Sequence, residues 1–156
     1  MNLQELFERQ HRRIYRIAMM MLKNTSDAED AVQNIFLKYI EKEFEFTDTE
    51  HENAWFITVT RNYCRDQLKH SWNRRVDLGE IPEIATEDAV ESNLTVHLLK
   101  LPIKYREVIY LYYYEEYSIR EMAHILARKE STIQTQLSAA RKKFKKTLEK
   151  EGISYE

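Results

Sequence analysis

The chain contains only two glycines and two prolines in 156 residues, and this scarcity limits its possible folds more than any other feature. Folds built from many strands, and nucleotide-binding α/β folds, need frequent glycine turns between their elements. Gly79, Pro82 and Pro102 lie in the middle of the chain, and Gly152 lies near its end. The sequence therefore predicts an all-α protein in which long helices are joined by few breaks.

The charge distribution predicts two small helical domains joined by an acidic linker. Residues 1–75 have no net charge, residues 76–99 carry six acidic side chains without Lys or Arg, and residues 100–156 have a net charge of +4. We expect a first domain over residues 1–75, a linker over 76–92 and a second domain over 93–156. The linker is either a solvated connector or a strip that occupies a basic groove on a partner or on the neighbouring domain.

Cysteine content and hydropathy indicate a protein of a reducing compartment. The single cysteine, Cys64, excludes an internal disulfide and a cysteine-rich metal site. The first residues contain no basic segment followed by an apolar run, so we expect no signal peptide. The apolar run at residues 17–22 is closed by Arg16 and Lys23, far short of the roughly 18 residues that span a membrane. We expect a cytoplasmic protein.

Hydrophobic periodicity predicts three helices in the first domain. Apolar residues recur at intervals of three and four over residues 3–22, which marks one face of a long helix. Ser26 and Glu29 have the spacing of a capping box and are expected to open a second helix. A polar stretch at residues 44–52 then precedes a third helix around Trp55.

Four further helices are expected in the second domain. The first ends near Leu101 and Pro102, and the second runs from residue 103 to about 116, although its core has strand propensity. Ser118 and Glu121 form another capping box at the start of a short helix, and the periodic pattern resumes from Ser131 to Leu148. A short helix, a tight turn and a longer helix form the helix-turn-helix pattern, whose second helix enters the DNA major groove.

The outward face of the last helix suits DNA. Its first half carries hydroxyl and amide side chains; Gln can contact an adenine through two atoms, and Ser or Thr can read several bases. The cations that follow suit phosphate contacts, although they also complement the helix C-terminal dipole. The candidate DNA-contacting residues are Ser131, Thr132, Gln134, Thr135, Gln136, Ser138, Arg141, Lys142 and Lys145.

Over almost its full length the chain resembles sigma-70-type RNA polymerase sigma factors. Residues 27–36 (DAEDAVQNIF), with residues 6–22, resemble the helices that bind core polymerase. Residues 54–66, with the Ala-Trp-Phe triplet and the Arg-Asn pair, resemble the helix that melts and reads the minus-10 promoter element. Residues 101–108 and the helix-turn-helix resemble the domain that reads the minus-35 element. A chain with only these two domains is similar to the extracytoplasmic-function (ECF) group.

This resemblance implies a bacterial transcription initiation factor without catalytic activity, metal or cofactor. The core RNA polymerase and promoter DNA would be its partners, together with an anti-sigma factor that could cover a tyrosine-rich segment at residues 105–117. A loop within residues 44–53 would help to hold a flipped base. The implied core-polymerase-binding residues are Asp27, Glu29, Asp30, Gln33 and Phe36. The implied minus-10 residues are Trp55, Arg61, Asn62, Arg65 and Lys69.

Some of these residues also have purely structural interpretations. Asp27 and Glu29 favour a helix N-terminus, and Trp55 suits a core position at least as well as a DNA contact. Five positions depart from the usual family pattern. In the turn, Ala127 replaces a common Gly, Arg128 replaces an apolar residue and Lys129 replaces a common Ser. In the helix that follows, Gln134 and Gln136 replace common basic residues.

Two other functions are compatible with parts of the sequence. A stand-alone helix-turn-helix regulator would use the same last helices but gives no reason for residues 27–36. A di-iron enzyme could use the two E-x-x-H motifs that begin at Glu8 and Glu121, but it would need further inward-facing carboxylates. The sequence therefore favours the initiation factor over both.

Overall fold

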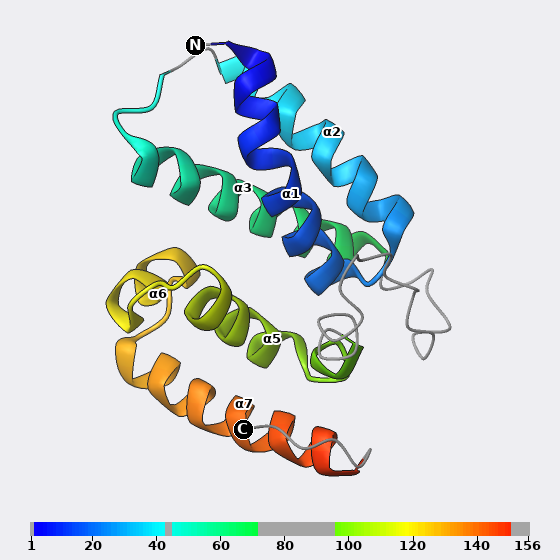
Figure 1. Ribbon diagram of the computed structural model, residues 1–156, viewed down its shortest axis with the longest axis vertical. Coiled ribbons are helices and arrows are strands. Elements are labelled where there is room, and N and C mark those ends of the chain that lie inside the picture. The colour runs from blue at the N-terminus through cyan, green and yellow to red at the C-terminus, as the bar shows by residue number, and fades with distance from the viewer. Residues whose placement is uncertain (1, 43–44, 72–95, 151–156) are drawn as a thin grey trace. The chain divides into compact units, whose positions relative to one another are not determined.

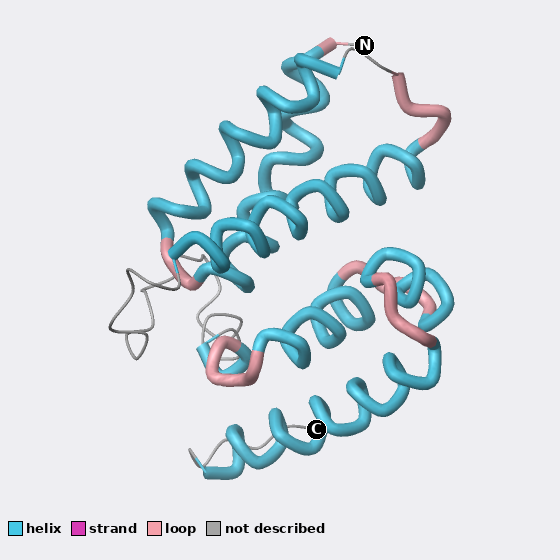
Figure 2. The backbone as a smooth tube through the Cα atoms, turned by 180° about the vertical axis from the view of Figure 1, so that it is seen from behind, coloured by secondary structure: helices cyan, strands magenta, loops and turns pink. Residues whose placement is uncertain are grey.

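The computed structural model describes residues 2–42, 45–71 and 96–150. Figures 1 and 2 show helices and loops in these parts of the chain, and the prediction of an all-α fold is confirmed for them. The chain divides into two units, residues 1–82 and 83–156. The predicted acidic linker at residues 76–92 lies outside the described residues, so its boundaries stay a prediction.

Unit 1 is formed by α1 (Leu3–Leu22), α2 (Thr25–Lys42) and α3 (Thr49–Ser71). The long helix α1 packs against both α2 and α3, as Figure 1 shows. Its apolar stripe is buried as the periodicity predicts, except that Leu3 and Phe7 remain 47% and 40% exposed. The fully buried core of the unit includes Leu6, Ile14, Ile17, Ala28, Ile35, Phe56 and Cys64.

The helix α2 begins two residues earlier than a Ser26 cap would place it. Asn24 Oδ1 accepts a hydrogen bond from the backbone N–H of Asp27 at 2.8 Å, so Asn24 is the cap. The predicted capping box of Ser26 and Glu29 is therefore wrong, because both residues lie inside the helix. Asn caps a helix as well as Ser does, and here it stands closer to the end of α1.

The helix α3 also begins earlier than expected. Asp48 Oδ1 accepts from the backbone N–H of His51 at 2.7 Å, and Thr49 is the first helical residue. The polar stretch predicted as a loop up to Glu52 is therefore partly helical. Of the base-pocketing loop expected within residues 44–53, the described non-helical part is residues 45–48.

Unit 2 contains α5 (Ile103–Ile109), the π-helix η1 (Tyr110–Tyr114), α6 (Ile119–Leu126) and α7 (Glu130–Lys150). The helices α5 and α6 both pack against α7. Leucine, valine, methionine and isoleucine side chains form the buried core: Leu99, Val108, Met122, Ile133, Leu137 and Leu148.

The segment with strand propensity is helical, but its last turn is wider than an α-helix. Within η1, the rings of Tyr110 and Tyr114 stack with centroids 5.2 Å apart. The backbone N–H of Glu115 bonds to the carbonyl of Tyr110 at 3.1 Å, and Tyr110 Oη donates to the Glu115 carboxylate at 2.7 Å. The predicted helix exists, and its π geometry ends it by Glu115.

The helix-turn-helix follows. Its capping box is confirmed, because Ser118 Oγ accepts from the N–H of Glu121 and the Glu121 carboxylate accepts from the N–H of Ser118, at 3.1 and 2.9 Å. Ala127 closes α6 with left-handed dihedral angles, φ 55° and ψ 48°. This turn allows α7 to begin after two more residues and to pack across α6.

Candidate polymerase and nucleic-acid interfaces

The helix α7 turns its apolar residues toward the core and its predicted DNA-reading residues outward. Ile133, Leu137 and Ala140 are buried. Two of the nine candidate residues, Thr132 and Gln136, are half-buried. The other seven are exposed: Ser131, Gln134, Thr135, Ser138, Arg141, Lys142 and Lys145. One helix therefore presents hydroxyl and amide groups near its start and cations further along.

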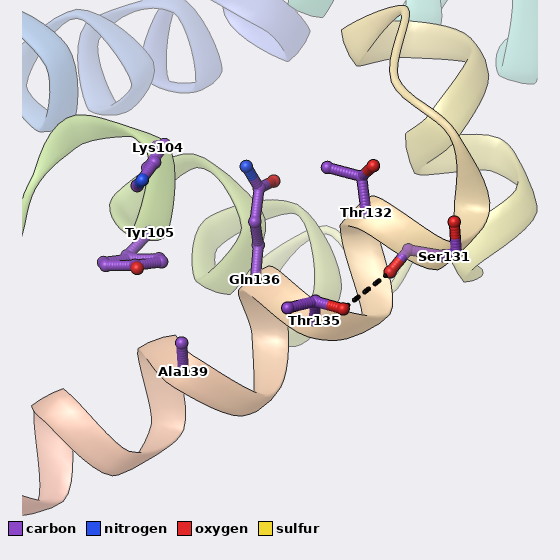
Figure 3. A pocket seen from close by; sticks show the side chains of 7 residues that line it. All are labelled: Lys104, Tyr105, Ser131, Thr132, Thr135, Gln136 and Ala139. Atoms are coloured by element: carbon purple, nitrogen blue, oxygen red, sulfur yellow. Dashed lines mark hydrogen bonds between the residues drawn. The ribbon is translucent and has the colours of Figure 1, made fainter.

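A shallow groove of about 370 Å³ lies between the start of α5 and the first half of α7. Lys104 and Tyr105 line it from α5, and Figure 3 shows them facing the side chains that rise from α7. The α7 residues that line it are Ser131, Thr132, Thr135, Gln136 and Ala139. Four of these five are candidate DNA-contacting residues, so the groove belongs to the predicted reading surface.

Two ammonium groups flank the tyrosine of this groove. Lys104 Nζ lies 5.1 Å from the centre of the Tyr105 ring, and Lys143 Nζ lies 5.9 Å from it. Cations within about 6 Å of the centre of an aromatic ring are attracted to the partial negative charge on the face of the ring. The groove thus has a positive edge, which suits an anionic backbone.

Arg128 links the residues of this groove to the core, although the sequence interpretation did not single it out as a contact. Its Nη1 donates to Gln136 Oε1 at 2.9 Å, and its Nη2 donates to Glu107 Oε1 at 2.5 Å. The Glu107 side chain is buried and that of Arg128 is 19% exposed. No local pattern could reveal this link, because Glu107 lies 21 residues earlier in the chain.

Arg141 differs from the two lysines predicted with it. Its Nε donates to Tyr113 Oη at 2.5 Å, and its guanidinium lies 5.4 and 5.5 Å from the ring centres of Tyr112 and Tyr113. This arrangement ties η1 to α7. Arg141 therefore has a structural role in addition to the phosphate contact that the sequence predicts.

Three of the predicted minus-10 residues share the exposed side of α3. Asn62, Arg65 and Lys69 are separated by three and four residues, and all are exposed. Arg61 lies at the flank of this side and is half-buried. The opposite side is buried, and burial raises the pKa of the Cys64 thiol there to about 12, which keeps it protonated and unreactive at neutral pH.

Trp55 belongs to an aromatic cluster that extends to the surface. Its ring centroid lies 4.9 Å from that of Phe56, 5.8 Å from Phe46 and 6.0 Å from Tyr39. The indole is half-buried. Trp55 therefore packs against the described loop and α2, and its environment differs from that of the exposed residues on α3.

A polar network joins the start of α3 to α1. Arg9 donates two hydrogen bonds to the Glu52 carboxylate at 2.9 and 3.1 Å, and Gln10 Nε2 donates a third at 2.6 Å. Burial raises the pKa of Glu52, but the bonds from Arg9 and Gln10 outweigh burial, and the net pKa lies below its ordinary value. Glu52 is therefore buried and joins the start of α3 to α1.

The exposed face of α2 carries most of the predicted polymerase-binding residues. Glu29, Asp30 and Gln33 are exposed and Asp27 is half-buried. Phe36 is only 7% exposed, because its ring lies 5.0 Å from that of Phe7 and 5.5 Å from that of Phe56. Phe36 is thus a core residue that packs beneath the exposed residues of α2.

Two apolar residues extend this face, and the sequence interpretation missed them. Leu37 is 57% exposed and Ile40 is 47% exposed. They follow Gln33 by four and seven residues, so they continue the same side of the helix. We call Glu29, Asp30, Gln33, Leu37 and Ile40 the α2 face. Its signal in the sequence is a pair of apolar residues that lie off the buried stripe.

Two residues of the E-x-x-H motifs, His11 and Glu121, are engaged in other contacts. The His11 ring stacks on Phe7 with centroids 4.7 Å apart, and Glu121 belongs to the capping box. Among the described residues, no three His, Cys, Asp or Glu side chains are grouped to hold a metal ion. None of the described helices is long and apolar enough to cross a membrane.

Comparisons with known proteins agree with this division into two modules. The model of Sigma-70 region 2 matches residues 6–74, and the model of Sigma-70, region 4 matches residues 93–144. The chain is 26% identical over 148 residues to the ECF RNA polymerase sigma factor SigM of Mycobacterium tuberculosis H37Rv, covering 92% of this chain and 76% of that protein. It is 27% identical over 155 residues to the ECF RNA polymerase sigma factor SigM of Bacillus subtilis, covering 93% and 94%.

A solved structure shows the same fold. The sigma factor RpoE of Bartonella quintana, solved in complex with the anti-sigma factor NepR, matches with a TM-score of 0.72 and 21% identity over 89% of this chain and 91% of that one. The two matched regions together cover most of the sequence, in the order that the sequence analysis expects. The chain therefore belongs to the sigma-70 family of RNA polymerase sigma factors, in the ECF group, and acts in transcription initiation.

Proposed function

We propose that unit 1 binds core RNA polymerase and helps to open the minus-10 element, while unit 2 binds the minus-35 element. The observation that carries this proposal is the exposed side of α7, where hydroxyl and amide groups are followed by Lys142 and Lys145. Such a helix can read base edges with its first half and bind phosphates with its second half.

The α2 face is the proposed contact with core polymerase. It combines the acidic and amide side chains of Glu29, Asp30 and Gln33 with the exposed apolar side chains of Leu37 and Ile40. Interfaces usually place an apolar centre beside polar groups that set orientation. Leu37 and Ile40 would supply the buried area, and the carboxylates would meet basic residues of the polymerase.

The exposed side of α3 is the proposed contact with the minus-10 element. Asn62 can bond base edges, and Arg65 and Lys69 can bind the backbone of a separated strand. The half-buried Arg61 lies at the flank of this side, and Trp55, also half-buried, lies on this side two turns before Asn62. We assign Trp55 to holding the loop at residues 45–48 in place, with an unstacked base as its further contact.

The protein would have no chemistry of its own and would act in the cytoplasm with the polymerase. An anti-sigma factor is a further proposed partner, because Tyr113 and Tyr114 are 55% and 46% exposed on η1. A large exposed aromatic pair is typical of a surface that a partner covers. A stand-alone regulator is not favoured, because the Sigma-70 region 2 match spans residues 6–74.

Transcription from a genomic template library tests the proposal. Purified core enzyme with the full chain should start transcription at a restricted set of promoters that share sequences near −10 and −35. Core enzyme alone serves as the control and should show no such set. If adding the chain leaves the start sites unchanged, the proposed function is wrong.

A further inference from the structure

The two glutamines of α7 differ in what they can offer to a base. Gln134 is exposed, whereas Gln136 is half-buried beside Arg128. An arginine side chain has only donors, so the Gln136 amide atom that faces it must be the oxygen. The contact thus fixes which way the amide points, with its oxygen 2.9 Å from Arg128 Nη1.

Arg128 is itself held from the other side by a buried carboxylate. Its second nitrogen, Nη2, donates to Glu107 Oε1, and the Glu107 side chain is 6% exposed. Charged hydrogen bonds of this kind are strong and directional. Glu107, Arg128 and Gln136 therefore form a chain of contacts that runs from the core to the reading surface, and we call it the Glu107–Arg128–Gln136 relay.

The amide nitrogen of Gln136 is left for the groove. Among the described residues, Gln136 has no other hydrogen-bond partner, and its side chain lines the groove between α5 and α7. Figure 3 shows the Gln136 amide rising from α7 among the other lining side chains. The groove thus receives two N–H donors at this point.

We propose that the relay makes Gln136 a donor-only reader of the minus-35 element, specific for guanine, with Arg128 as its positioning residue. The two-atom contact with adenine needs the glutamine oxygen to accept from the N6 amino group, and that oxygen is turned to Arg128. Guanine presents two acceptors, O6 and N7, to the two N–H groups. This inference rests on the proposed minus-35 function of unit 2.

Substitution of Gln136 by Glu gives the sharpest test. The introduced carboxylate keeps the shape of the amide and the Arg128 contact, but it presents an acceptor to the groove where Gln136 presents donors. In holoenzyme binding to promoters with a randomised minus-35 element, Gln136→Glu should change the preference at one base position from guanine to cytosine, whose N4 amino group donates. We expect about a tenfold change in relative binding at that position.

Substitution of Gln134 by Glu is the matched control. It adds the same charge to the same helix turn, so its general repulsion of phosphates should match that of Gln136→Glu. Because Gln134 is itself a candidate base contact, any preference it changes should fall at a different base position, and the guanine preference that Gln136 confers should stay in place. If both variants change the same base position, or if Gln136→Glu changes none, the inference is wrong.

Arg128→Lys tests the positioning role. Lysine keeps a positive charge beside Glu107, but its single nitrogen cannot reach both acceptors as the two guanidinium nitrogens do. The melting temperature of unit 2 should change little, while the base preference should shift from guanine toward adenine as the Gln136 amide turns. An unchanged guanine preference would show that Arg128 does not position Gln136.

These outcomes separate the inference from the proposed function. If the wild-type holoenzyme has no minus-35 preference, the proposed function fails and the inference falls with it. If the wild-type preference exists but contains no guanine position that responds to Gln136→Glu, only the inference fails.

Discussion

At the scale of single residues, three non-glycine residues of the described chain adopt left-handed backbone angles: Lys23, Glu116 and Ala127. Each lies where one helix ends or a turn leads into the next. For a residue with a Cβ atom, left-handed backbone angles cost roughly 1 kcal/mol, whereas glycine adopts them without this cost. The turns of this protein therefore keep a strain that other residue choices would relieve.

We predict that Ala127→Gly stabilises unit 2 by about 0.5–1 kcal/mol, because Ala127 has φ 55°. Native-state hydrogen exchange of the α6 and α7 amides would show protection that rises by up to about fivefold. The control is Ala139→Gly inside α7, where the same substitution should destabilise by a similar amount. Reduced protection in Ala127→Gly would contradict this explanation.

Glu52 gives a second residue-scale prediction, because its pKa lies below the ordinary value of 4.5 in the folded protein. A carboxylate with a lowered pKa adds stability above its unfolded pKa and loses it as pH falls toward the folded pKa. We expect Glu52→Gln to destabilise unit 1 by about 1–2 kcal/mol at pH 7, and this difference should close as pH falls below about 4.5.

Urea unfolding followed by tryptophan fluorescence measures this effect in unit 1, because both tryptophans of the chain, Trp55 and Trp72, lie within residues 1–82. Glu50→Gln is the control, since Glu50 is exposed in the same helix turn. It should change the stability by only a few tenths of a kcal/mol. A Glu52 effect that is the same at pH 4 and pH 7 would show that its charge has no role.

At the scale of elements, hydrophobic periodicity was enough to predict the described helices but not where they begin. Asn24 and Asp48 cap α2 and α3 ahead of the expected positions, because several polar residues near each end compete for the role. The π turn of η1 also could not be foreseen, since it depends on which carbonyl the Glu115 N–H reaches.

The candidate site was predictable in part for a related reason. The outward residues of α7 follow from the helix period, which assigns Ile133 and Leu137 to the core. The contact of Glu52 with Arg9 and that of Arg128 with Glu107 do not follow from the helix period. The two residues of each pair lie 43 and 21 positions apart in the sequence. Contacts of this range depend on helix packing, and no local pattern encodes them.

The cationic half of α7 carries an element-scale prediction. If Lys142 and Lys145 bind phosphates, Lys142→Gln and Lys145→Gln should each weaken binding to all promoter sequences alike. Each should also lower the salt dependence by about one released counterion. Holoenzyme titrations at several KCl concentrations measure this slope. Lys150→Gln, at the end of the same helix, should leave the slope unchanged; a sequence-dependent loss in Lys142→Gln would contradict the assignment.

At the scale of the whole molecule, the described chain forms two helical units, and we propose that both bind promoter DNA while unit 1 also binds the polymerase. Unit 1 presents the α2 face and the exposed side of α3, and unit 2 presents α7 and its groove. Each unit has its own buried core, so each can hold its surface without the other. On the proposed function, these surfaces act together only when the chain is bound to core polymerase at a promoter.

The central claim is therefore best tested by titrating the labelled full chain with core RNA polymerase in the absence of DNA. We predict saturable binding that Leu37→Asp weakens at least about tenfold, because a charge would enter the apolar part of the α2 face. Tyr114→Asp, which adds the same charge to an exposed aromatic of unit 2, should weaken it much less. A wild-type chain that does not bind core polymerase and instead binds duplex promoter DNA alone would contradict this claim.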